Sequence, residues 1–191
     1  MKFQLVGVAA LLIASKFEEI YPPEVDEFVR MTDNAFSRSE VLATEAQMLR
    51  VLDYQLVVPT CYHFMVKYFE TAKAPQRARH LASFYAEKYM HVQESLEYEP
   101  HVLVAICLYA AIKQHQQFPT GHTGFECGGW TPALEQETQM SENRLLPLSR
   151  ELMKEISEPQ FTNRGQKLIA TQRKFGRDAY LKASLLPLPS L

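Results

Sequence analysis

The chain has 191 residues, of which 47% are hydrophobic and 11% aromatic, a composition typical of a packed globular protein. Its formal net charge of −2 argues against a nucleic-acid-binding surface, which would be basic. The three cysteines (Cys61, Cys107 and Cys127) are odd in number and far apart, which excludes a disulfide framework and favours a reducing, intracellular compartment. With only seven glycines and few β-branched runs, the chain is expected to be all-α.

The stretch FQLVGVAALLIASKFEEIY, residues 3–21, contains a helix that is apolar on every side. From Leu5 to Ala14 only Gly7 is not hydrophobic, so we expect the rest of the chain to pack around this helix. The run is about half as long as a membrane span, and no membrane partner is expected. A cleaved signal peptide is an alternative, because Met1-Lys2 precede the run and Ala14-Ser15 follow it. The absence of an Asn-x-Ser/Thr site disfavours secretion.

Two further helices are predicted before residue 59. Pro22-Pro23 open a short helix, 22–31, and Thr32-Asp33-Asn34 break it. Ser37 has Glu40 three residues later, which is the pattern of a capping box, and the helix that it begins is expected to run to about Tyr54. Residues 57–60 read as an extended linker, in which Thr60 is placed to cap the next helix.

The second part of the chain is predicted to be helical as well. Prolines at or next to the expected ends mark most boundaries, because their fixed φ suits a helix start or stop. The expected helices are 60–71, 75–91, 99–116, 131–139, 142–157 and 162–178. Phe118 to Trp130 reads as a glycine-rich loop, and residues 184–191, SLLPLPSL, as an irregular tail.

The two parts look like an internal repeat. Residues 102–112, VLVAICLYAAI, form a second all-apolar helix, and an offset of 97 places Ala9 on Ile106 and Leu11 on Leu108. Each apolar helix is followed by a short helix and then by a longer amphipathic one. Two helices precede the second apolar helix and almost nothing precedes the first, so the first repeat is expected to lack its two leading helices.

The segment LVGVAALLIASKFEEIYPPEVDEFVRMTDNAFS closely resembles the middle of the first cyclin box of A- and B-type (mitotic) cyclins. The resemblance continues through Glu45, Met48-Leu49 and Val58-Pro59-Thr60, and it thins out after Tyr68. It implies a cyclin fold of two helical repeats, with the first truncated at its N-terminus. The boundaries implied are a partial first box at 1–58, a second box at 59–180 and a tail at 181–191. The family's docking patch for substrates, in the leading helices, is not found here.

The family is one of regulatory subunits, so the resemblance implies that a cyclin-dependent serine/threonine kinase is the partner. It also implies nuclear and cytoplasmic locations. By motif position, Lys16 and Glu45 would be the polar clamp on helix C of the kinase. Apolar contact would come from five further residues, Phe17, Ile20, Leu49, Tyr54 and Leu56.

The same residues have plainer interpretations, which stay open here. Lys16 at a helix C-terminus can bond last-turn carbonyls and favours the helix dipole. Glu45 lies near the apolar side of its helix and needs a partner, because burying an unpaired charge is costly. Phe17 and Leu49 would fit an ordinary core. The uncovered helix Phe3–Ile13 leads to two alternative expectations: the chain self-associates through it, because a large exposed apolar patch invites association, or the first half stays loosely ordered while residues 59–178 remain folded.

No catalytic, cofactor or metal site is expected. The pairs His122/Cys127 and Cys61/His63 are too few for a zinc site, and the loop GHTGFECGG lacks the Lys-Ser/Thr of a phosphate loop. Thr131-Pro132 reads as an N-cap and first helical residue more simply than as a phosphorylation site. The alternatives to a kinase regulator are a cyclin-fold scaffold or transcription-related module without a kinase, a non-activating truncated cyclin, and an unrelated helical enzyme.

Overall fold

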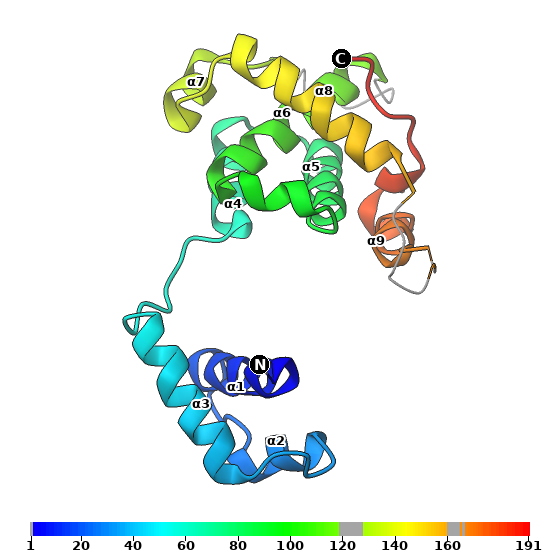
Figure 1. Cartoon of the computed structure of the whole chain (residues 1–191). Helices are drawn as coiled ribbons and strands as arrows, with labels where there is room; N and C mark the ends of the chain where they lie inside the picture. The colour runs from blue at the N-terminus through cyan, green and yellow to red at the C-terminus, as the bar shows by residue number, and fades with distance from the viewer. Residues whose placement is uncertain (1, 119–127, 160–164, 166) are drawn as a thin grey trace. The chain divides into compact units, whose positions relative to one another are not determined.

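The computed structural model describes residues 2–118, 128–159, 165 and 167–191. Its secondary-structure elements are helices, which confirms the predicted all-α class (Figure 1). Contacts divide the chain into two compact units, Met1–Val58 and Pro59–Leu191, and each is described by itself.

The first unit consists of α1 (Phe3–Glu18), α2 (Val25–Met31) and α3 (Arg38–Val51). Figure 1 shows α1 lying against α3, with α2 near the start of α3. Leu12 of α1 is fully buried at the centre, and the core around it also contains Val25, Phe28, Phe36 and Val41. The core is small because α1 presents only this one side to its neighbours within the unit.

The helix starts in this unit follow the local sequence closely. Ser37 is the N-cap of α3, and Ser37 and Glu40 form the predicted capping box. The short helix begins at Val25 rather than at Pro22, because Glu24 is extended as the N-cap and a residue before proline is pushed out of helical geometry. The third helix ends at Val51 rather than near Tyr54.

The second unit is built around α6 (Pro100–Gln117), whose residues 103–112 are all buried. The helices α4 (Cys61–Thr71), α5 (Gln76–Tyr89) and α8 (Glu142–Ser157) pack on it. Thr60 is the N-cap of α4, and α7 (Pro132–Thr138) begins as predicted, since Thr131 caps it and Pro132 is its first residue. The predicted apolar helix therefore lies at the centre of its unit.

The expected helix 162–178 is wrong in extent. The described residues before 170 are not helical, and α9 covers only Ala170–Phe175. The chain turns after Phe175, whose ring packs between Phe84 and Tyr180, so tertiary packing overrides the local helical pattern. Short 3₁₀ helices at Gln93–Glu97, Asp178–Tyr180 and Ala183–Leu185 were not predicted. The predicted glycine-rich loop falls mainly on residues 119–127, outside the described residues.

The internal repeat is confirmed by the order of the helices, since α1, α2 and α3 correspond to α6, α7 and α8. The turn after each short helix repeats too. Thr32 Oγ1 donates to Val29 O over 2.7 Å, and Thr138 Oγ1 donates to Leu134 O over 2.7 Å. A left-handed residue follows each threonine, with φ 55° at both Asp33 and Gln139.

The two apolar helices differ in how they are covered. Leu108 of α6 is 0% exposed, whereas Leu11, its counterpart in α1, is 52% exposed. In the second unit α4 and α5 pack against α6, and within Met1–Val58 the neighbours of α1 are α2 and α3. The expectation that the chain packs all round the first apolar helix is thus not met within its own unit.

Candidate functional site

Lys16 and Glu45 meet between α1 and α3. Lys16 lies in the last turn of α1 and donates from Nζ to Glu45 Oε1, in the middle of α3, over 2.6 Å. The Glu45 side chain is 10% exposed and the Lys16 side chain 46%. A buried carboxylate needs a partner, and the sequence analysis expected one for Glu45. Lys16 is that partner. The pair reaches the surface through Lys16.

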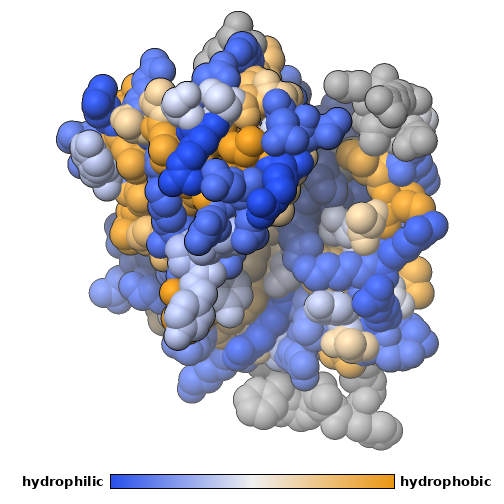
Figure 2. Space-filling view, turned by 90° about the horizontal axis from the view of Figure 1, so that it is seen from below, coloured by the Kyte–Doolittle hydropathy of each residue, from blue (hydrophilic) through white to orange (hydrophobic). Residues whose placement is uncertain are grey.

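The five apolar residues predicted to contact the kinase lie near the ends of α1 and α3. Of the five predicted contact residues, Phe17, Ile20 and Tyr54 are exposed, and Leu49 and Leu56 are half-buried. Leu49 lies one helical turn after Glu45 and so shares its face of α3. Figure 2, which views the molecule from below, shows hydrophobic side chains (orange) at the surface among more numerous hydrophilic ones. Phe17 is therefore not the core residue that the plainer interpretation made it.

The end of α3 is shaped by two residues in the left-handed conformation. Asp53 has φ 49° and Tyr54 has φ 57°, a region that an aromatic residue rarely adopts. Tyr54 N donates to Leu49 O over 2.9 Å, so the chain folds back against the last turn of the helix. Such backbone persists where the surroundings hold it, and it is found disproportionately at functional sites. Here it ends the helix and brings Tyr54 close to Leu49.

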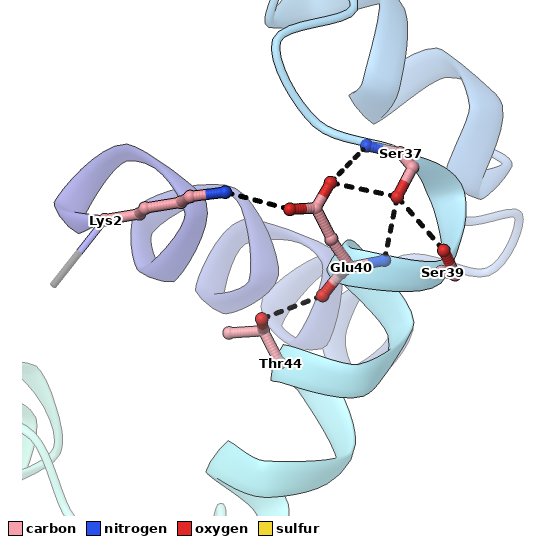
Figure 3. Close-up of polar contacts among 5 residues, drawn as sticks. All are labelled: Lys2, Ser37, Ser39, Glu40 and Thr44. Atoms are coloured by element: carbon pink, nitrogen blue, oxygen red, sulfur yellow. Dashed lines mark hydrogen bonds and ion pairs between the residues drawn. The ribbon is translucent and has the colours of Figure 1, made fainter.

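A second polar cluster joins α1 and α3 at their N-terminal ends (Figure 3). Lys2 Nζ lies 2.9 Å from Glu40 Oε1, and Glu40 Oε2 accepts from the backbone N–H of Ser37 over 2.9 Å. Thr44 Oγ1 donates to the Glu40 carbonyl over 2.8 Å. The backbone hydrogen bond from Ser37, helped by Lys2, lowers the pKa of Glu40 from 4.5 to about 2. Two ion pairs thus set how α1 lies on α3.

This pKa shift predicts an acid sensitivity of the first unit. A carboxylate whose pKa is lower in the folded state contributes stability above pH 4.5, and that contribution is lost as the pH falls towards 2. We expect the thermal midpoint of the first unit to fall with pH over this range, and to fall less in Glu40→Gln. Circular dichroism melts at half-unit pH steps measure both. Equal slopes for the two proteins would contradict the assignment.

The structure also shows a groove that the sequence reasoning missed. It has a volume of ≈ 280 Å³ and lies between α1 and α3, lined by Val6, Thr44, Gln47, Met48, Val51 and Leu52. The apolar residues near the end of α3 include Met48, Leu49 and Val51. Met48 and Leu49 are half-buried, whereas Val51 is exposed. The sequence carried a signal for this groove, because α3 has apolar residues on more than one face. A helix with a single buried face needs only one stripe of apolar residues.

The second unit has a related lysine–glutamate pair. Lys113, the counterpart of Lys16 at the offset of 97, lies 2.6 Å from Glu142, the first residue of α8. Tyr109 donates to the same carboxylate over 3.0 Å. The hydrogen bonds from Lys113 and Tyr109 lower the pKa of Glu142. At the same offset Glu142 is the counterpart of Glu45, but it begins α8, whereas Glu45 lies in the middle of α3.

The described part of the second unit contains two free cysteines. Burial raises the pKa of the thiols of Cys61 and Cys107, so neither is an activated nucleophile. In the part of the chain that the structure describes, no three histidine, cysteine or acidic side chains are placed to hold a metal ion. None of its helices is both long and apolar enough to cross a membrane. His122 and Cys127, weighed above as metal ligands, lie outside the described residues.

Two protein-family models match the chain: "Cyclin, N-terminal domain" over residues 1–57 and "Cyclin, C-terminal domain" over residues 59–189. Cyclin-A1 of Xenopus laevis is 34% identical over 195 residues, covering 100% of this chain and 42% of that protein. The G2/mitotic-specific cyclin-B of Arbacia punctulata is 31% identical over 183 residues, covering 96% and 42%. Cyclin-B1-3 of Oryza sativa is 37% identical over 152 residues, covering 80% and 30%. The chain spans less than half the length of each.

The fold also occurs among solved structures. A viral cyclin from herpesvirus saimiri matches with a TM-score of 0.58 and 21% identity, over 81% of this chain and 66% of that one. At this identity the likeness shows the fold alone. It confirms the predicted cyclin fold.

Proposed function

We propose a function from the premise that the chain belongs to the cyclin family, whose members are non-catalytic regulatory subunits of kinases. The function is to bind and activate a cyclin-dependent serine/threonine kinase in cell-cycle control. The similarity to A- and B-type cyclins supports the mitotic branch of the family. The chain itself supplies no catalytic group to this role.

The observation that carries the proposal is the Lys16–Glu45 pair, which reaches the surface of the first unit through Lys16, with Phe17, Ile20 and Tyr54 exposed at or just after the ends of the same two helices. A lysine ammonium has three N–H donors and a carboxylate accepts several hydrogen bonds, so each group has capacity beyond their shared contact. The two groups together suit the main chain of a docked helix, which offers both N–H and C=O groups near its ends. The exposed apolar side chains would be desolvated by the same helix.

The activation that follows from such docking is positional. A kinase needs the glutamate of its helix C paired with the ATP-binding lysine, and the position of helix C controls this pair. A cyclin surface that holds helix C inward stabilises the active arrangement and props the activation loop. The first unit would do this through α1 and α3.

A titration with a matched pair of variants tests the proposal. Ile20 is 88% exposed and Met31, at the end of α2, is 70% exposed. An aspartate at either position should therefore change the stability of the fold little. We expect Ile20→Asp to weaken binding to a cyclin-dependent kinase by at least about ten-fold, because a charge would be buried in the apolar contact. We expect Met31→Asp to bind like the unchanged chain.

The same titration, read by phosphorylation of a peptide substrate, separates activation from binding. Saturable binding without a rise in phosphorylation would leave a cyclin that binds without activating. No binding by the unchanged chain, with both units folded by circular dichroism, would overturn the proposal in favour of a cyclin-fold module without a kinase.

We also propose that copies of this chain associate through Phe3–Ile13, because Leu11 and Phe3 are exposed on the uncovered side of α1. Leu11→Glu is expected to shift the chain to a monomer in sedimentation velocity at concentrations where the unchanged chain associates. Met31→Glu should not change the distribution. A monomeric unchanged chain at high concentration would contradict this.

A further inference from the structure

Three glutamine side chains hold the main chain of the C-terminal segment, residues 184–191. Gln172 Nε2 donates to Ser184 O over 3.1 Å, and Gln114 Nε2 donates to Pro187 O over 2.5 Å. Gln117 makes two bonds to Ser190, from its Nε2 to the carbonyl over 2.6 Å and to its Oε1 from the backbone N–H over 2.8 Å. Figure 1 shows this segment, in red, running from the end of α9 back to the end of α6.

Of the held positions, Ser184 lies in the 3₁₀ helix Ala183–Leu185, whereas 187 and 190 follow that helix and are three residues apart. Three residues make one turn of a polyproline II helix, so the latter two positions repeat on one side of such a helix. Leu186 has φ −79° and ψ 145°, which is polyproline II geometry. The segment contains Pro187 and Pro189, which lack N–H groups, so its backbone offers mainly carbonyls. Glutamine amides that donate to these carbonyls match that chemistry.

The surface beneath the segment is built to receive it. Gln114 is buried, at 1% exposed, and its Oε1 accepts a hydrogen bond from the hydroxyl of the fully buried Tyr85. This contact orients the amide so that its N–H group faces Pro187 O. Burial raises the pKa of Tyr85, which keeps the hydroxyl protonated as a donor. Pro189 is buried, and Leu186 and Leu191 pack against the core of the second unit.

We infer that the C-terminal end of α6 is a docking groove for an extended, proline-punctuated peptide, and that this chain fills it with its own tail. Recognition combines amide hydrogen bonds to the peptide main chain with burial of Pro189 and packing of the two leucines on the core. This is the mode in which proline-rich segments are read elsewhere, with the low-entropy polyproline helix already formed before docking.

The internal repeat relates this groove to a surface of the first unit. At the offset of 97, Gln114 and Gln117 are the counterparts of Phe17 and Ile20, which the first unit exposes at the end of α1. The tail therefore covers, in the second unit, the place whose counterpart in the first is proposed to bind the kinase. It follows that each chain has a single kinase-docking surface. This consequence rests on the proposed function, whereas the docking of the tail does not.

Hydrogen exchange on the full chain, without any kinase, tests the docking. The Ser190 N–H is held by Gln117 Oε1. Gln117→Ala removes this acceptor, so we expect Ser190 to exchange about three- to ten-fold faster, as loss of one such bond implies. Gln117→Glu keeps an acceptor oxygen and should preserve more of the protection than Gln117→Ala. A Ser190 amide that exchanges at the rate of an unstructured peptide in the unchanged chain would overturn the inference.

A labelled peptide SLLPLPSL supplies the second test. In the unchanged chain the tethered tail competes at a high effective concentration and should exclude the peptide. Ser190→Pro removes the backbone N–H that Gln117 holds and leaves the groove intact, whereas Ser190→Ala keeps this N–H. We expect fluorescence anisotropy to show at least about three-fold tighter peptide binding to Ser190→Pro than to Ser190→Ala. Peptide binding that is equal in the two variants would overturn the cis-docking model whether or not the chain binds a kinase.

Discussion

Glu45→Ala and Lys16→Ala are each expected to weaken binding to a cyclin-dependent kinase by at least about ten-fold. Truncating one partner of a buried, hydrogen-bonded charge pair at an interface costs about 2–5 kcal/mol. Isothermal titration of each variant against the same kinase measures the change. Glu40→Ala is the control, because Glu40 pairs with Lys2 between the same two helices but lies outside the predicted contact surface. A loss below two-fold for both Lys16→Ala and Glu45→Ala would refute the site.

The pair also stabilises the first unit, and this effect must be separated from binding. Lys16→Ala leaves the 10% exposed Glu45 carboxylate without its partner, whereas Glu45→Ala leaves a lysine that is 46% exposed and can reach water. We therefore expect Lys16→Ala to lower the free energy of unfolding more. A Lys16→Met/Glu45→Met variant should recover stability, because apolar replacement of a buried pair is often neutral, yet it should not recover kinase binding. Recovery of both would make the pair purely structural.

Leu108→Ala is expected to destabilise the second unit by about 2–5 kcal/mol, because it leaves a cavity in a closely packed core. Its counterpart Leu11→Ala should change the first unit by no more than about 0.5 kcal/mol, since half of that side chain already faces solvent. Native-state hydrogen exchange reads α6 and α1 separately in each variant. The single tryptophan, Trp130, packs on Tyr109 and gives a fluorescence signal for the second unit in denaturant.

This comparison tests the difference between the two repeats directly. The two leucines occupy matching positions of matching helices, so the same chemical change is made in both. Similar losses of stability would show that the side of α1 bearing Leu11 is covered in solution, and self-association through Phe3–Ile13 is one way for that to happen. A concentration dependence of the Leu11→Ala effect would identify that cause.

Some features of this protein are determined by a few neighbouring residues, and the sequence alone predicts them. Ser37 and Glu40 cap α3 through bonds that span three positions, and Thr131-Pro132 begin α7 in the same local way. The unbroken apolar run before Lys113 predicts a helix buried on all sides, and α6 is one. The motif KFEEIYPP and the order of helices likewise identify the family before any coordinates are considered.

Other features depend on which distant segments meet, and only the tertiary structure decides them. Lys16 has a good local partner in the last-turn carbonyls, yet it pairs with Glu45, 29 positions away, because α1 packs on α3. Leu11 and Leu108 read alike in sequence and differ in burial because α4 and α5 pack on α6. Gln114 and Gln117 hold the tail over 73 positions, and no local pattern marks them. Glutamine amides and lysine side chains can hydrogen-bond to many partners. The packing of distant segments, and not the spacing of residues in the sequence, therefore decides which partner each one binds.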